Sequence, residues 1–369
     1  MGYLTRRQHR ATLTPMGDAK RKGFFLSAAL AGSGSALAHE KWFFKGQRPP
    51  LELTSVFAPP NLFFVLFALF VTGTAYLWWR LRGYRGLLPG PDFFGGLAWR
   101  RSALYGLVPA ILGVHVAVPL LVNGVQGTLF APSSTLPGAW TYVLGLVQTG
   151  VALSFFYGGF ARAAAVVLAL VWTLGLFVVG PEGMLENVLY LGFAGFFYLA
   201  GRGPISIDRL IFPRLEPPAR LIRYAVPTMR VGVGLSLVAV ALTEKLANLP
   251  LATGFLEQHP LNFTGALGLP LPDTFFILSA GTVELIVGLF IVFGIFPREI
   301  ILVAWLPFNL TLTVFNWSEL IGHLPFYGAM AVLLVWSSVR GGPLAVDGPD
   351  AEKVLEPNVP PEVAASKGL

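Results

Sequence analysis

The chain of 369 residues contains no cysteine, which excludes disulfides, thiolate metal sites, cysteine-held Fe–S clusters and covalently attached c-type haem. Charged residues are also scarce, at 12% of the sequence against about a quarter in a soluble domain. A nucleophile triad pattern, a Walker loop and a dinucleotide fingerprint are missing as well. These absences exclude an ordinary soluble protein, and an enzyme that acts alone is not expected.

Hydrophobic residues make up 54% of the chain and fall into long blocks separated by short basic loops. A membrane-spanning helix needs about 20 apolar residues. The pattern predicts an all-α, polytopic transmembrane helical bundle in contact with membrane lipid. The nine candidate crossings, of which 187–201 is short, lie near 61–79, 103–124, 139–157, 163–180, 187–201, 226–248, 274–296, 300–317 and 325–339.

The placement of positive charge predicts the orientation of the chain. Although the net charge is +7, the arginines lie between apolar blocks, so nucleic acid is not expected as a partner. Arginines occupy every second loop, including Arg162 and Arg298, whereas the intervening loops carry acids such as Glu182 and Glu257. The positive-inside rule therefore predicts a multi-pass protein of the cell inner (plasma) membrane, with its mature amino terminus outside and its carboxyl terminus cytoplasmic.

The amino terminus resembles a secretory signal. Basic residues 20–22 precede an apolar stretch that ends in Ala36-Leu37-Ala38, a small-x-small cleavage pattern. Residues 1–38 are predicted to be a cleaved signal peptide, with an uncleaved first helix as the alternative and Met16 as an alternative start. Cleavage would leave His39 first in an extracytoplasmic segment, 39–60.

Polar residues recur at matched spacings in the two halves of the chain. Fourteen residues separate Arg101 from His115 and Arg230 from Glu244, and the same spacing separates Gln148 from Arg162 and Glu284 from Arg298. The match predicts a duplicated four-helix unit. The predicted organisation is an extra helix and first unit in 61–204, a cytoplasmic linker in 205–225, a second unit in 226–343 and a disordered cytoplasmic tail in 344–369.

The second unit resembles the DoxX family of four-helix membrane proteins. The motifs that carry the resemblance are Arg230-Val-Gly232-Val-Gly234, Glu244-Lys245-Leu246 and Ala280-Gly281-x-x-Glu284-x-x-x-Gly288. The resemblance implies two DoxX-like four-helix repeats and a link, through the related DoxD subunit, to thiosulfate:quinone oxidoreductase. Because the chain lacks cofactor motifs, electron transfer would need a redox partner subunit that carries the cofactor. If the protein takes part in an enzyme, we expect it to be a non-catalytic or quinone-interacting subunit of an oxidoreductase.

Several polar residues are expected at one depth in the outer half of the membrane. Because a helix rises about 1.5 Å per residue, positions 14 residues beyond an interfacial arginine lie roughly 21 Å deeper. The candidates for ligand binding or proton exchange are Glu284, Glu244, His115, Gln148 and Asn309. They either hydrogen-bond one another to fix the bundle or line a pocket for a quinone head group or another small ligand.

A third interpretation concerns the outer face, where histidines and acids gather. Glu319 and His323 are spaced i, i+4, and an amino-terminal His39 would offer both an amine and an imidazole. With His259, these residues are candidate ligands for copper or zinc. The alternative is that they are solvated loop residues.

The function favoured by these patterns is a quinone- or redox-linked membrane component. A transporter of a small solute or metal ion and an assembly scaffold for a membrane complex are the alternatives, because paired repeats with a polar layer also suit alternating access.

Overall fold

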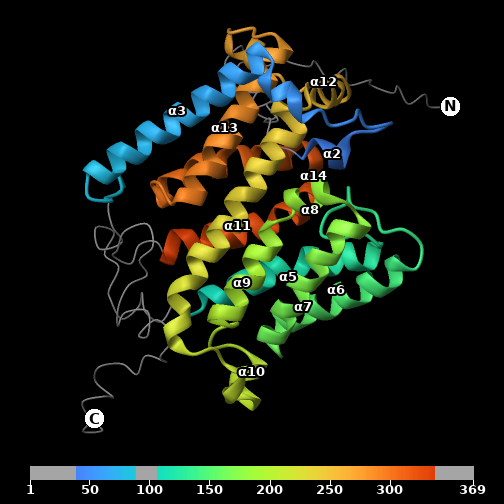
Figure 1. Ribbon diagram of the computed structural model, residues 1–369, viewed down its shortest axis with the longest axis vertical. Coiled ribbons are helices and arrows are strands. Elements are labelled where there is room, and N and C mark those ends of the chain that lie inside the picture. The colour runs from blue at the N-terminus through green and yellow to red at the C-terminus, as the bar shows by residue number, and fades with distance from the viewer. Residues whose placement is uncertain (1–38, 89–105, 337–369) are drawn as a thin grey trace, which may run out of the picture.

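The computed structural model describes residues 39–88 and 106–336 (Figure 1). Within these ranges the chain is all-α, as predicted, and an isolated bridge joins Thr128 to Thr135. The predicted signal peptide 1–38, Arg101 and the predicted tail 344–369 lie outside the described residues.

The long helices match the predicted apolar blocks, except at the carboxyl-terminal end. There the last two predicted crossings lie within one helical element of 40 residues, which contains the membrane-length segments Pro297–Phe315 and Trp317–Trp336; the connection between them is helical, so the expected loop is wrong. This helix contains Pro307 and Pro325, which membrane helices tolerate because neighbouring groups satisfy the freed carbonyls. The long helices are α3 Pro59–Leu81, α5 Val108–Gln126, α6 Trp140–Tyr157, α7 Ala161–Val178, α9 Leu189–Ala200, α11 Ala225–Val240, α13 Asp273–Phe293 and α14 Pro297–Trp336.

Seven helical segments in the described part of the chain are long and apolar enough to cross a membrane, two of them within α14. The chain is therefore a multi-pass membrane protein. Helix α9 has 12 residues and falls short of the length a crossing needs. The count of nine crossings, the orientation and the division into domains stay predictions.

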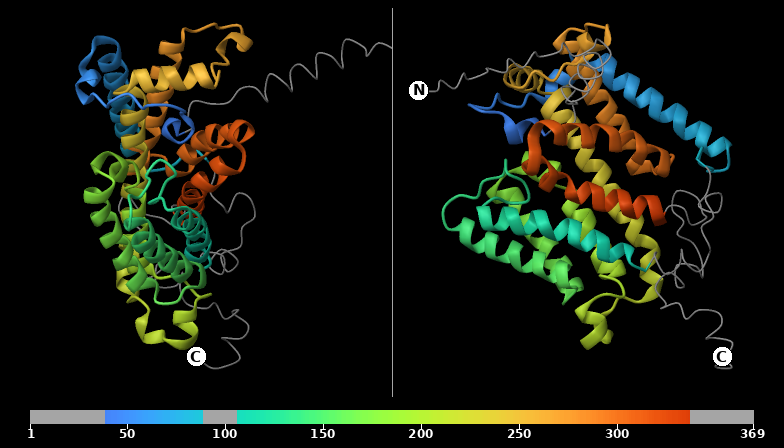
Figure 2. Two further views of the ribbon diagram at one scale, coloured as in Figure 1. Left: turned by 90° about the vertical axis from the view of Figure 1, so that its right-hand side faces the viewer. Right: turned by 180° about the vertical axis from the view of Figure 1, so that it is seen from behind.

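The helices form two groups that lie side by side (Figures 1 and 2). The first group consists of α5, α6, α7 and α9. The second consists of α3, α11, α13 and α14, and in it α3 packs on α13 at the opposite edge of the bundle. The groups meet where α11 packs on α9 and where α14 packs on α5. The segments Gly158-x-Phe160-x-Arg162 and Gly294-x-Phe296-x-Arg298 share a local conformation, since Phe160 and Phe296 both have positive φ angles, of 54° and 43°. The duplication of a four-helix unit stays a prediction.

Paired glycines bring the central helices into backbone contact. A Cβ atom on Gly232 of α11 would lie 2.6 Å from the Cα of Gly192 on α9. On the other side of α11, a Cβ on Gly234 would lie 2.6 Å from the carbonyl oxygen of Gly288 on α13. Membrane helices associate through small residues of this kind, because the bilayer gives little hydrophobic drive for helix pairing. Helix α11 is thereby fixed at the centre of the bundle.

Helix α11 continues into one π-helical segment, Ala241–Leu246, before Asn248 caps α12 (Leu249–Gln258). The segment contains Glu244 and Lys245, with relative exposures of 0% and 1%. A π-helical turn has an altered residue spacing and is frequent at functional sites. Here it directs two adjacent charged side chains into the interior.

Candidate functional site

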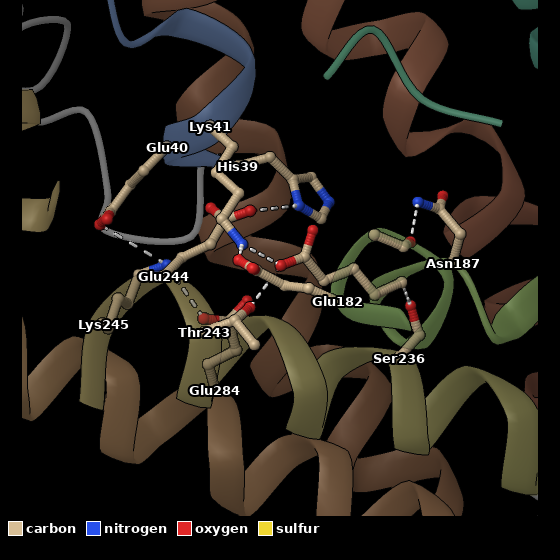
Figure 3. A network of polar contacts seen from close by, with 12 residues as sticks. His39, Glu40, Lys41, Glu182, Asn187, Ser236, Thr243, Glu244, Lys245 and Glu284 are labelled. Atoms are coloured by element: carbon tan, nitrogen blue, oxygen red, sulfur yellow. Dashed lines mark hydrogen bonds and ion pairs between the residues drawn. The ribbon is translucent and has the colours of Figure 1, made fainter. Parts of the chain in front are cut away.

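A group of buried charged residues lies where five elements converge, and we refer to it as the buried charged cluster (Figure 3). Its members come from the amino-terminal segment with α2 (Glu40–Phe43), from α8 (Pro181–Glu186), and from the π-helical segment, α13 and α14. All of them are buried. They are His39, Glu40, Lys41, Glu186, Glu244, Lys245, Glu284, Glu319 and His323.

The amino-terminal segment contributes three consecutive charged or titratable side chains. His39 stacks on Trp42, with 4.0 Å between ring centroids, and the Trp42 ring occupies the space that a side chain on Gly322 of α14 would need. This contact docks the short helix α2 against α14. As a result His39, Glu40 and Lys41 reach different partners in the interior (Figure 3).

Lys245 and Glu244 form separate ion pairs. The Nζ atom of Lys245 lies 3.1 Å from Oε2 of Glu284 and 3.7 Å from Oε1 of Glu40. The Oε1 atom of Glu244 lies 3.8 Å from Nδ1 of His39. Within the described residues, neither carboxylate oxygen of Glu244 has a hydrogen-bond partner. The adjacent side chains of Glu244 and Lys245 therefore diverge, although both are buried.

Lys41 connects the cluster to the surface. Its ammonium donates hydrogen bonds to the carboxylates of Glu186 and Glu182, the latter at 2.5 Å. The Glu186 carboxylate also accepts a hydrogen bond from the Thr243 hydroxyl at 2.5 Å. Because the side chain of Glu182 is 42% exposed, this chain of contacts leads from solvent to the interior.

Glu319 and His323 lie on one face of α14, as their spacing predicts. Oε1 of Glu319 is 3.1 Å from Nε2 of His323, and both residues have a relative exposure of 0%. The His323 ring packs edge-on against Phe308 at 4.5 Å. Its centroid lies 6.1 Å from that of His39.

Burial and neighbouring charges shift the acid–base properties of the cluster members outside the spanning segments. Burial raises the pKa of Glu40 to about 8, although the charge of Lys245 opposes the shift. Burial also raises the pKa of Glu186. Burial alone would lower the pKa values of His39 and Lys41, but the Glu244 carboxylate, with Glu186 in the case of Lys41, raises both. Burial therefore favours the neutral forms of Glu40 and Glu186, whereas the neighbouring carboxylates favour the charged forms of His39 and Lys41.

The predicted ligand or proton-exchange candidates are only partly brought together. Glu284 and Glu244 meet in the cluster, whereas the polar contact of His115 is with the carbonyl of Ile111 on its own helix, at 2.8 Å. Asn309 likewise donates to the carbonyl of Trp305 on its own helix, at 2.7 Å.

Gln148 ties the loop after α5 to the bundle. Its side chain accepts a hydrogen bond from the Phe130 amide at 3.1 Å and donates one to the carbonyl of Leu120 at 2.9 Å. Through these hydrogen bonds Gln148 of α6 holds α5 and the loop after it within the group of α5, α6, α7 and α9.

Three of the four predicted metal ligands lie in the cluster. His39, Glu319 and His323 are there, but His259 lies at the end of α12, packed against Phe255 and Phe315. Across residues 39–88 and 106–336, no group of three or more histidine, aspartate or glutamate side chains is arranged to hold a metal ion. Metal binding by these residues stays a prediction.

The sequence analysis did not predict Lys41, Glu40, Glu186 and Lys245 as site residues, nor the contacts that Glu182 and Thr243 make with the cluster. A signal for the first was available, because Lys41 and Lys245 are basic residues on the side where the positive-inside rule expects few. Ion pairs with the buried acids Glu186 and Glu284 are one reason for Lys41 and Lys245 to lie on the predicted outer side.

Comparisons with protein-family models, with curated proteins and with solved structures found no match. The class of protein therefore rests on the fold and the cluster: a multi-pass, all-α membrane protein with an ionised interior.

Proposed function

We propose that the protein is a redox-linked membrane component that binds a quinone head group beside the buried charged cluster. The observation that carries this proposal is the placement of charged side chains against aromatic rings inside a bundle of membrane-length helices. Ionisable residues in such a bundle are costly, and they mark functional sites by default.

The cluster has hydrogen-bonding capacity to spare. Lys245 and His323 are paired with the carboxylates of Glu284 and Glu319, and Nδ1 of His323 has no hydrogen-bond partner among the described residues. Buried polar groups that serve only to fix a bundle are normally satisfied by one another. A ligand with carbonyl oxygens would accept hydrogen bonds from the lysine and the imidazole.

Aromatic rings surround the two imidazoles. Trp42 stacks on His39, while Phe308 and Tyr327 lie edge-on to His323. A flat head group packs favourably on such rings. The charged and aromatic surfaces together suit a quinone better than an aliphatic solute.

The chemistry expected of the site follows from its contacts. A quinone takes up electrons and protons together when it is reduced to a quinol. The electrons would come from a redox partner subunit that carries the cofactor, because the sequence of this chain has no cofactor motif. The Lys41–Glu182 contact offers a route for protons between the cluster and the surface.

The test is purification in mild detergent followed by mass spectrometry of the extracted lipids. We expect about one quinone per chain in the wild-type protein and its loss in Glu284→Gln, with the quinone content of the variant referred to its folded fraction because Glu284 is also an ion-pair partner of Lys245. Glu257→Gln is the matched control, because Glu257 is an exposed acid of α12 outside the cluster.

A wild-type protein without quinone, or a Glu284→Gln variant that retains it, contradicts the proposal. In that case counterflow of a small solute or metal ion into vesicles would identify a transporter. A stable partner protein without ligand would identify an assembly scaffold.

A further inference from the structure

His39 occupies an unusual position for a residue that directly follows a predicted cleavage motif. It comes immediately after Ala36-Leu37-Ala38, yet only 7% of its surface is exposed. A histidine at a free amino terminus offers two nitrogens, the α-amine and Nδ1, which can close a chelate ring on one metal ion. Copper and zinc both favour nitrogen donors of this kind.

The second imidazole of the cluster lies at a suitable distance. The ring centroids of His39 and His323 are 6.1 Å apart. Because a metal ion binds an imidazole nitrogen at about 2.0–2.1 Å, two rings on opposite sides of one ion have centroids roughly 6 Å apart. The observed separation matches this arrangement.

His323 is available as a ligand. It has a relative exposure of 0%, and within the described residues neither ring nitrogen has a hydrogen-bond partner. Glu319 lies 3.1 Å from its Nε2 atom, and both Glu319 oxygens also lack hydrogen-bond partners in the described ranges. A carboxylate beside a ligating imidazole is a common feature of metal sites, either as a further ligand or as a group that orients the ring.

From these observations we infer that removal of residues 1–38 turns His39 into an amino-terminal chelate that binds one copper(II) or zinc(II) ion together with His323. The donors are the α-amine and Nδ1 of His39 and a ring nitrogen of His323, with Glu319 alongside. This nitrogen-rich set suits copper or zinc, whereas magnesium and calcium prefer oxygen donors.

The site depends on processing of the chain. No three histidine, aspartate or glutamate side chains in residues 39–88 and 106–336 form a metal site, so the α-amine is the donor that completes it. Before cleavage the His39 nitrogen is a peptide nitrogen and binds such ions poorly. Metal binding and maturation of the chain are thereby linked.

The first test identifies the amino terminus. Mass spectrometry of the protein purified from membranes is expected to find His39 as the first residue. A purified protein that retains an intact peptide across Ala38 and His39 overturns the proposal.

The second test measures metal binding with copper(II) chloride or zinc chloride alone. We expect one ion per processed chain, with affinity reduced at least 100-fold in His39→Gln and in His323→Gln. His259→Gln is the control, since His259 lies outside the cluster and should leave binding unchanged. Binding that survives His323→Gln overturns the proposal.

A third preparation separates the α-amine from the imidazole. In a variant with residues 36–38 replaced by the recognition sequence of a site-specific protease, one sample can be measured before and after cleavage frees His39. Tight binding should occur only after cleavage. Equal affinity in both states contradicts the role of the α-amine.

Discussion

Lys245 holds the central position among the charged side chains of the interior. It is 1% exposed and lies within ion-pair distance of Glu284 and Glu40. Removal of one partner from a buried ion pair leaves an uncompensated charge, which typically costs about 3–5 kcal/mol. The stability of the bundle therefore depends strongly on Lys245, because its removal leaves two buried carboxylates without their ion-pair partner.

We predict that Lys245→Met lowers the free energy of unfolding by about 3–5 kcal/mol, measured by denaturant titration in detergent. The double variant Lys245→Met with Glu284→Leu should recover much of the loss, because the unpaired carboxylate is then absent. Glu257→Gln, at an exposed position of α12, should change stability by less than about 0.5 kcal/mol. An unaffected Lys245→Met variant would show that the pair contributes little.

Some site residues could be predicted because they are ionisable residues inside otherwise apolar segments or share one face of a predicted helix. Glu284 and Glu244 interrupt apolar blocks, and Glu319 and His323 share a helical face, so the sequence singled them out. The contact of Lys41 with Glu182 joins residues 141 positions apart. It depends on the docking of α2, which no local pattern encodes.

At the scale of helices, the crossing of α9 and α11 depends on the absence of side chains. A Cβ on Gly232 would lie 2.6 Å from the Cα and 2.8 Å from the amide nitrogen of Gly192. Backbone atoms at these distances cannot move aside without separation of the helices.

We predict that Gly232→Ala lowers stability by about 1–3 kcal/mol, because the extra methyl group overpacks the crossing. Gly150→Ala in α6 is the matched control, since a Cβ there meets nothing within 4 Å. By helix propensity alone that control should gain up to about 1 kcal/mol. Thermal unfolding in detergent distinguishes the two, and equal effects would contradict the close packing of α9 and α11.

The helices themselves were largely predictable, because block length and hydropathy determine them. The exceptions were the continuation of α14 through Pro307 and Pro325 and the π-helical segment at the end of α11. In both cases the neighbouring helices stabilise the backbone conformation. Neither the position of proline nor the hydropathy of the segment specifies that conformation. The π-helical segment carries Glu244 and Lys245, so the local feature most relevant to the site was also the least visible in the sequence.

At the scale of the whole molecule, the lack of cysteine makes the predicted orientation directly testable. Single cysteines can be introduced without removing any native ones. Glu257 in α12 and Arg214 in the segment between α10 (Ile207–Ile211) and α11 are both exposed and lie on opposite predicted sides.

We predict that a membrane-impermeant thiol reagent added to intact cells labels Glu257→Cys but not Arg214→Cys. Arg214→Cys should be labelled after the membrane is permeabilised. The reverse pattern would place the buried charged cluster near the cytoplasmic side and would contradict the predicted route of the amino terminus.

The central claim is that a quinone binds beside the buried charged cluster, and quenching of tryptophan fluorescence by an added short-chain quinone tests it most directly. Trp42 stacks on His39 in the cluster, whereas Trp317 is 75% exposed. We predict saturable quenching in the wild-type protein that Trp42→Phe reduces strongly and Trp317→Phe leaves in place. Saturable quenching that is unchanged by Trp42→Phe would contradict binding at the cluster.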